Sequence, residues 1–292
     1  MQNINALAYL KGDSMMSYKK LLTIQDISCV GQCSLTVALP IISACGVETC
    51  VMPSAVLSTH TGGFTGYTFR DLTDDMPKIK EHWLKEKISF DSIYTGYLGS
   101  TKQIDYVENI FDELGRENCF KIIDPAMADN GNLYPGFDNV FVQAMKKLCG
   151  KADYLLPNIT EACLLTDIEY KTEYNKEYIE QLLHGLEALG CKNVILTGVS
   201  YEAGKTGVVV FEQGVYSYYE HECIAGGCHG TGDIYASAFA GSLLRGKSTY
   251  EAAKIAADYV VLCIKETQKE ENHWYGAKFE PVISKLIEML EK

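Results

Sequence analysis

Short runs of apolar and β-branched residues alternate along the chain with longer stretches in which apolar residues recur at helical spacing. The short runs are typical of buried strands and the longer stretches of amphipathic helices. We predict strands over residues 21–25, 49–57, 92–95, 120–124, 154–156 and 194–197. We predict helices between them, over about 34–44, 78–87, 103–114, 140–149 and 178–189. Apolar strands that alternate with helices predict an α/β fold, with a mostly parallel central sheet and helices on both faces.

The alternation of predicted strands and helices ends after residue 197. Two apolar runs, 207–211 and 215–219, are separated by a short polar turn and predict an antiparallel hairpin. Three helices follow, near 233–244, 249–265 and 278–290. No linker rich in Pro, Gly or Ser divides the chain, so we expect one domain over 16–292 and a dispensable leader over 1–15. Ligands of such sheets bind at the carboxyl ends of the strands, where we look for the chemistry.

Composition and charge narrow the possible partners. The net charge of −12 argues against nucleic acid, whose binders present clustered Lys and Arg. No window reaches the roughly 18 apolar residues that a membrane helix needs, so we expect no membrane partner. The 11 cysteines have no paired short spacings, apart from one C-x3-C that lacks a matching pair. We therefore expect free thiols, no zinc and a cytoplasmic protein.

The most informative segment is a glycine-rich turn that leads directly into an apolar helix. Four glycines lie within residues 226–232, and Asp233 follows in the predicted first helical turn. The amides of Gly230, Thr231 and Gly232, together with the positive end of the helix dipole, predict a hole for phosphate oxygens. A carboxylate beside such a hole is unsuited to binding phosphate but well placed as a general base for an acceptor hydroxyl.

The alternative for this segment is an ordinary turn in which Asp233 merely stabilises a helix N-terminus. That alternative leaves unexplained the polar residues that end the predicted strands. Other nucleotide-binding motifs are absent, because the chain has no G-x4-G-K-[ST] and its first strand–helix turn lacks G-x-G-x-x-G. The sequence thus favours a kinase over a P-loop protein or a nicotinamide-dependent dehydrogenase.

The G-x-G-D turn resembles the signature of the ribokinase-like superfamily, and within it the chain is most similar to the pyridoxal/pyridoxamine kinases. Further segments carry the resemblance in the order of the family, and most of them end a predicted strand. These are Ile24-Gln25-Asp26 with Gly31, Ser58-Thr59-His60-Thr61-Gly62, Thr95-Gly96-Tyr97, the run from Asp124 to Gly131, and Asn158-Ile159-Thr160-Glu161. Each segment is weak alone, whereas the ordered set is specific.

The resemblance implies a ribokinase-like fold, a homodimer, and transfer of a phosphoryl group from ATP to the 5′-hydroxymethyl group of a B6 vitamer with Mg2+ as cofactor. Asp233 would be the base and the amides of residues 230–232 the anion hole. The other implied roles are ATP and phosphate binding by Asp124, Asn158 and Thr197, metal binding by Glu161 and Asp129, and vitamer binding by Asp26, His60, Thr61 and Tyr97.

The chain departs from the family pattern at several positions. Asp26 replaces a common serine, Ala128 a glycine and Leu156 a threonine, while His229 resembles some hydroxymethylpyrimidine kinases. A kinase for hydroxymethylpyrimidine is therefore the nearest alternative. A sugar or nucleoside kinase and a vitamer-binding regulator without catalysis are more distant ones.

Simpler interpretations remain for individual residues. Asp124 precedes a proline and could shape a turn, Tyr97 could pack, and His60 could be a loop histidine bonded to backbone. Asp26 could contact the pyridine ring, bind a hydroxyl of another substrate, or bond the amides of its own turn.

Overall fold

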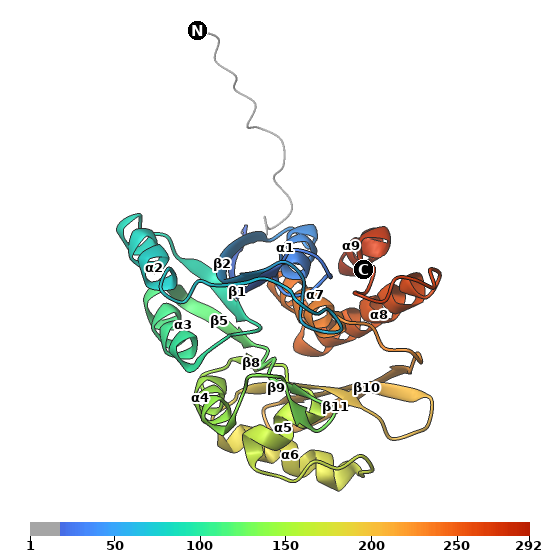
Figure 1. Cartoon of the computed structure of the whole chain (residues 1–292). Helices are drawn as coiled ribbons and strands as arrows, with labels where there is room; N and C mark the ends of the chain where they lie inside the picture. Colours follow the sequence, from blue (N-terminus) through green and yellow to red (C-terminus); the bar gives the residue numbers. More distant parts are fainter. Residues whose placement is uncertain (1–17) are drawn as a thin grey trace, which may run out of the picture.

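The apolar runs form one large sheet whose central strands are parallel (Figure 1). A computed structural model describes residues 18–292, and the predicted leader lies outside the described residues. The parallel strands, in spatial order, are β9 (Asn193–Val199), β8 (Tyr154–Leu155), β5 (Gly115–Ile123), β4 (Phe90–Thr95), β1 (Lys20–Ser28) and β2 (Glu48–Leu57). The antiparallel strands are β10 (Lys205–Glu212) and β11 (Val215–Glu222) at one edge and β3 (Phe69–Asp71) at the other. The predicted fold class and the predicted hairpin are confirmed.

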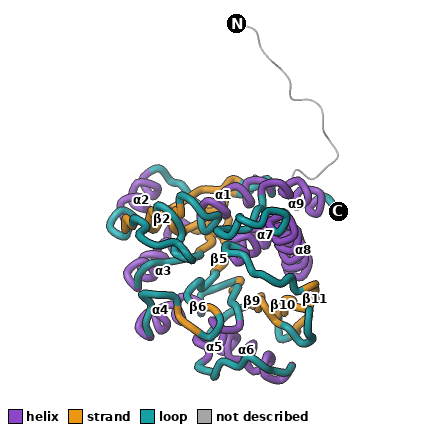
Figure 2. Tube along the Cα trace, turned by 45° about the vertical axis from the view of Figure 1, so that its right-hand side comes forward, coloured by secondary structure: helices purple, strands orange, loops and turns teal. Residues whose placement is uncertain are grey.

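Helices cover both faces of the sheet (Figure 1 and Figure 2). One face packs against α2 (Met76–Lys85), α3 (Thr101–Leu114), α4 (Asn139–Cys149), α5 (Ile159–Thr166) and α6 (Lys176–Ala188). The other packs against α1 (Leu35–Ala44), α7 (Thr231–Leu244), α8 (Thr249–Thr267) and α9 (Ile283–Leu290). Each face has its own buried apolar cluster, because a parallel sheet is apolar on both sides.

Several elements differ from those predicted. Helix α5 was missed, although Asn158 and Glu161 form a complete capping box at its start. The short hairpin of β6 (Ala128–Asp129) and β7 (Asn132–Leu133) was also missed. Its turn is Asn130-Gly131, with φ of 50° and 78°, the dipeptide that favours tight hairpins. The last helix begins at Ile283 rather than residue 278, because a 3-10 turn, Glu280–Val282, with a proline at its second position precedes it.

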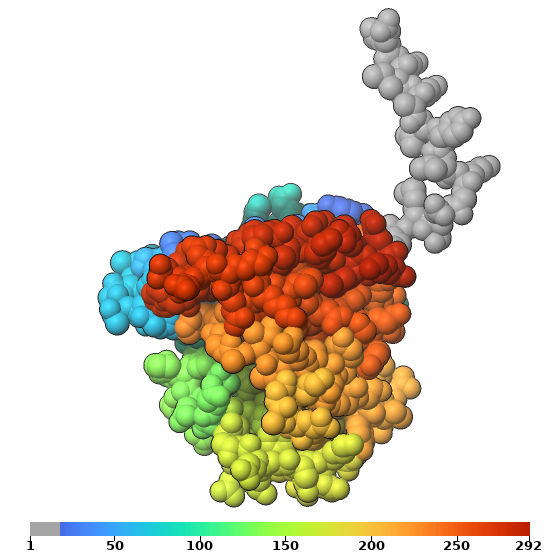
Figure 3. Space-filling view, turned by 90° about the vertical axis from the view of Figure 1, so that its right-hand side faces the viewer, coloured from blue at the N-terminus to red at the C-terminus, as the bar shows by residue number. Residues whose placement is uncertain are grey.

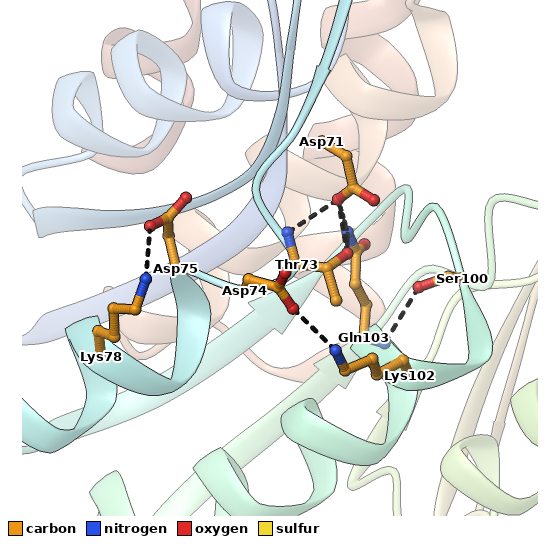
Figure 4. Close-up of polar contacts among 8 residues, drawn as sticks. All are labelled: Asp71, Thr73, Asp74, Asp75, Lys78, Ser100, Lys102 and Gln103. Carbon is orange, nitrogen blue, oxygen red and sulfur yellow. Dashed lines mark hydrogen bonds and ion pairs between the residues drawn. The ribbon is translucent and has the colours of Figure 1, made fainter.

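Buried polar contacts hold the β3–α2 loop against α3 (Figure 4). The Gln103 side chain, 1% exposed, donates to the Thr73 hydroxyl (2.8 Å) and to the Ser54 carbonyl (3.1 Å). Asp71 accepts from the Thr73 amide (2.8 Å). These bonds fix the return of the chain after the Ser58–Gly62 loop, which enters the candidate site.

Candidate active site

The predicted site residues end neighbouring parallel strands, so the topology brings them to one edge of the sheet. Asp26 lies near the end of β1 and Asp124 directly after β5. Asn158 follows β8 and forms an isolated bridge with Thr197 near the end of β9. His60 follows β2. The prediction that polar residues gather at the carboxyl ends of the strands is confirmed by this arrangement.

The glycine turn forms the N-terminus of α7. Gly230 is the residue before the helix and has φ 79°, a left-handed conformation that favours glycine. A Cβ on Gly230 would overlap the carbonyl oxygen of Gln32, whereas one on Gly232 would meet nothing within 4 Å. No side chain caps this helix, so the first amides of α7 are available to an anion.

Asp233 lies in the first turn of α7, as predicted, and is half-buried. Burial raises the pKa of its carboxyl from 3.8 to about 7, a hydrogen bond from the Ser34 backbone opposes the shift, and Asp26 adds to it. A carboxyl with a pKa near neutral pH is suited to accept a proton from a substrate hydroxyl.

Asp26 is 4% exposed, and its carboxylate accepts from the Ser28 hydroxyl at 2.8 Å. Burial raises the pKa of Asp26, while hydrogen bonds from the Ser34 and Ser28 side chains lower it. The Cys29 amide donates to the Leu57 carbonyl (2.9 Å) rather than to Asp26. The Ser28 hydroxyl therefore holds Asp26, and Ser34 lies near both this carboxylate and that of Asp233.

The His60 ring is 5% exposed and is bonded to backbone on both sides. Its Nδ1 accepts from the Gly62 amide (3.0 Å), so Nε2 carries the proton that it donates to the Tyr275 carbonyl (2.6 Å). Burial lowers the pKa of His60, which keeps the ring neutral. With both nitrogens engaged, His60 offers a substrate only its ring carbons.

Glu161 lies beneath the site and holds two loops together. One carboxylate oxygen accepts from the Met127 amide (3.0 Å) and the Ala128 amide (3.5 Å), and the other from the Asn158 amide (2.9 Å). The Asn158 side chain is likewise engaged, because it accepts from the Glu161 amide and donates to the Ala128 carbonyl. Three of the roughly four acceptor positions of the Glu161 carboxylate are therefore occupied by backbone amides.

Asp124 is a carboxylate whose ionised form a bound cation would stabilise. Burial raises its pKa well above 3.8, and the nearby Glu161 and Asp233 raise it further. No cluster of three or more His, Cys, Asp or Glu side chains among residues 18–292 forms a ready metal site. The Asp124 carboxyl, with Glu161 and Asp233 nearby, fits Mg2+, which binds proteins through few carboxylates and keeps much of its water or phosphate shell.

The remaining predicted residues lie around this centre. Asp129 is exposed and accepts from the amide of Asn130 (2.8 Å). The Thr197 hydroxyl donates to the Pro157 carbonyl (3.3 Å). The Tyr97 ring packs against Phe137, with centroids 5.5 Å apart, and Thr61 is exposed.

Two residues of the site were not predicted from the sequence. The partly exposed Tyr134 follows the β6–β7 hairpin, and desolvation together with the charges of Glu161 and Asp124 raises the pKa of its hydroxyl. The Asn130-Gly131 turn, which brings Tyr134 back to the Met127 carbonyl (2.8 Å), was the available signal. Nothing in the sequence marks Ser34 as a site residue, because its position depends on a left-handed φ of 54°.

We expect Glu161→Ala to destabilise the fold more than a matched change in an exposed capping box. It leaves three amides without an acceptor, and each unsatisfied buried donor costs about 1–3 kcal/mol. Loss of a buried carboxylate, whose pKa is raised to about 7, offsets part of this cost. The control is Glu251→Ala, in the exposed box with Ser248 on α8. Urea denaturation at neutral pH measures the loss of stability in both variants. Equal stability losses, with a raised Mg2+ requirement in Glu161→Ala alone, would instead indicate metal binding.

Comparison with known proteins identifies the family. A family model described as phosphomethylpyrimidine kinase matches residues 39–278. The chain belongs to this family. Among curated relatives, a pyridoxal kinase of Dictyostelium discoideum is 27% identical, over 65% of this chain and 63% of its own. The chain therefore spans less than two thirds of that relative.

Comparison with solved structures leads to the same family. A Bacteroides thetaiotaomicron protein assigned to the phosphomethylpyrimidine kinases, solved with pyridoxal, is 37% identical with a TM-score of 0.88, covering 92% of this chain and 96% of its own. Lactobacillus plantarum pyridoxal kinase is 29% identical with a TM-score of 0.87, covering 94% and 99%. The predicted relationship to the pyridoxal kinases and the ribokinase-like fold are confirmed. In the described part of the chain, no helix is long and apolar enough to cross a bilayer.

Proposed function

We propose that this protein transfers the γ-phosphoryl group of ATP to the 5′-hydroxymethyl group of a B6 vitamer, giving the 5′-phosphate and ADP. The observation that carries the proposal is the carboxyl of Asp233, whose pKa is raised to about 7 beside the uncapped amides of α7. The pyridoxal in the related Bacteroides structure supports a pyridine substrate.

Asp233 accepts the proton of the bound hydroxymethyl group as its oxygen attacks the γ-phosphorus in line with the leaving ADP. The amides of Gly230, Thr231 and Gly232 bind the phosphoryl oxygens, because they have no capping side chain of their own. Asp26, His60, Thr61 and Tyr97 line the vitamer side in this proposal.

Asp124, Asn158 and Thr197 lie on the nucleotide side, with Asp129 and Glu161 behind them. A bound Mg2+ would offset the negative charge on the phosphoryl oxygens. Asp124 is the residue that fits it, because burial and two neighbouring carboxyls raise its pKa and a cation would relieve both effects. Glu161 contributes by holding the Met127–Ala128 loop and Asn158 in place.

Hydroxymethylpyrimidine, or its phosphate, is the second candidate substrate. The family description favours it, since the matching model is that of phosphomethylpyrimidine kinases. Hydroxymethylpyrimidine leaves the chemistry unchanged, because it also presents a hydroxymethyl group on a planar aromatic ring, whereas on its phosphate ester the acceptor would be a phosphate oxygen. The two candidates therefore differ in ring contacts and share the base and the anion hole.

A substrate panel tests the proposal. Purified protein is given Mg-ATP with pyridoxal, pyridoxamine, pyridoxine or hydroxymethylpyrimidine, and kcat/KM is taken from the rate of ADP release. We expect the highest kcat/KM for a B6 vitamer. A higher value for hydroxymethylpyrimidine would assign the second function, and no release above the ATP-only rate with any acceptor would exclude both.

Asp26→Asn should weaken vitamer binding, and more so as the pH rises above the pKa of the free ring nitrogen. An ionised Asp26 near the ring favours a pyridinium and so helps the bound vitamer to keep its proton. Asn keeps the side-chain volume and an acceptor for the Ser28 hydroxyl but lacks the charge. The pH dependence of the vitamer Kd, with the ultraviolet band of the ring reporting protonation, measures this. A bound ring that titrates as in water would exclude the pairing.

A further inference from the structure

The turn between β1 and α1 lies near two of the candidate-site carboxylates, Asp26 and Asp233, and it has an unfavourable backbone conformation. Gln32 and Ser34 have φ of 53° and 54°, values that non-glycine residues rarely adopt. The Ser34 backbone lies close enough to Asp233, and the Ser34 side chain close enough to Asp26, to lower the pKa of each carboxyl. The carbonyl of Gln32 lies against Gly230, where a Cβ would overlap it. Such strain persists only where the surrounding structure holds it.

The C-terminal segment, residues 273–280, stabilises this turn by binding the side chain of Gln32. Its Nε2 donates to the Glu280 carboxylate, at 2.9 and 3.0 Å from the two oxygens. Its Oε1 lies 3.0 Å from Nε2 of His273. Both polar ends of a half-buried side chain are thus bonded to residues more than 240 positions away in the sequence.

The same segment is pressed against the backbone of the turn. A Cβ on Gly276 would lie 2.6 Å from the Gly31 carbonyl oxygen, so only glycine allows this approach. Tyr275 accepts from His60 (2.6 Å), and the Ala277 amide donates to the carbonyl of His229 (3.0 Å). Figure 3 shows the red C-terminal part of the chain beside blue segments from the N-terminal third.

We propose that Gln32 is a positioning residue: held by Glu280 and His273, it keeps the Gly31–Ser34 turn packed against Gly230, at the start of the helix that carries Asp233. This inference rests on the proposed function, in which Asp233 is the base. The C-terminal segment thereby becomes part of the catalytic architecture although it touches none of the reacting groups.

Gln32→Ala removes both bonds and keeps the strained Cβ, whereas Gln32→Gly removes both bonds and relieves the strain. We expect both to lower kcat about 10–100-fold, the scale of a small misplacement of catalytic groups, with the Kd of ATP unchanged. Because the Ser34 backbone bond lowers the pKa of Asp233, the midpoint of the acid limb of kcat/KM should also move to higher pH. A loss of packing alone would leave that midpoint in place.

Glu280→Ala provides a second, exposed variant that does not alter the turn itself. A double-mutant cycle with Gln32→Ala should be non-additive, because each change breaks the same bond. Glu288→Ala is the matched control, since within residues 18–292 the Glu288 side chain is bonded only to Lys285 on its own helix. We expect it to match the wild type.

Hydrogen exchange of the peptide that contains Gly31–Ser34 tests the inference independently of activity. Faster exchange in Gln32→Ala and Glu280→Ala, with Glu288→Ala unchanged, is the expected result. Unchanged exchange in the first two variants would overturn the inference, and so would a wild-type kcat in Gln32→Ala. A wild-type protein that phosphorylates no acceptor would overturn the proposed function, and the exchange rates would still decide whether the segment holds the turn.

Discussion

Asp233→Asn should abolish most turnover while making the folded protein more stable at neutral and alkaline pH. Loss of a general base costs a factor of about 10²–10⁴ in rate. Burial raises the pKa of Asp233 from 3.8 to about 7, so the folded state binds this proton more tightly than the unfolded state. Stability therefore falls as the pH rises from about 4 to about 7, and the full penalty is present above that range. Asn removes the penalty, which we expect to be about 1–3 kcal/mol.

Turnover, ATP affinity and the urea midpoint at pH 8 test this together. Asp138→Asn is the control, because Asp138 caps α4 from an exposed position where Asn serves equally well. In the wild type, kcat/KM should fall tenfold per unit below about pH 7. More than a tenth of wild-type turnover in Asp233→Asn, or a flat pH profile, would remove Asp233 from the role of base.

Gly230→Ala should lose both stability and activity. The residue has φ 79°, and its Cβ would overlap the Gln32 carbonyl oxygen, so the helix N-terminus and the β1–α1 turn must move apart. A left-handed conformation costs a non-glycine residue about 1–2 kcal/mol, and the overlap adds to this. Because the same movement separates Ser34 from Asp233, we expect turnover to fall at least 100-fold, as for other misplaced catalytic groups.

Gly232→Ala is the matched control for stability. It lies two residues away in the same turn, and its Cβ would meet nothing within 4 Å. We expect a wild-type urea midpoint for Gly232→Ala and a clearly lower one for Gly230→Ala. Equal midpoints would show that the turn tolerates a side chain at both positions.

Much of the fold could be predicted because the apolar strands and amphipathic helices alternate with clear periods. The elements that the hydrophobic pattern did not predict are short, and only local turn and cap residues mark them. Asn130-Gly131 marks the β6–β7 hairpin, and the spacing of Asn158 and Glu161 marks the start of α5. The resemblance assigns the latter pair to the cation and phosphate site, and the same spacing also forms a capping box.

The candidate site was predictable in its location but less so in its detailed contacts. Strand ends and the glycine turn identify one edge of the sheet from sequence alone. The bonding of His60 to Tyr275, and of Gln32 to Glu280, joins segments more than 200 residues apart. Nothing in the local sequence marks such contacts, because they depend on how the C-terminal segment crosses the first turn.

The central claim is that the phosphoryl group of ATP moves to a hydroxymethyl oxygen on an aromatic ring. Phosphorus NMR of a reaction of the wild-type protein with Mg-ATP and the preferred acceptor of the panel tests it most directly. We expect a new phosphate resonance that couples to the two protons of a methylene group and that grows as the ADP resonances appear. Inorganic phosphate as the only new phosphorus product, or a phosphate ester without methylene coupling, would contradict it.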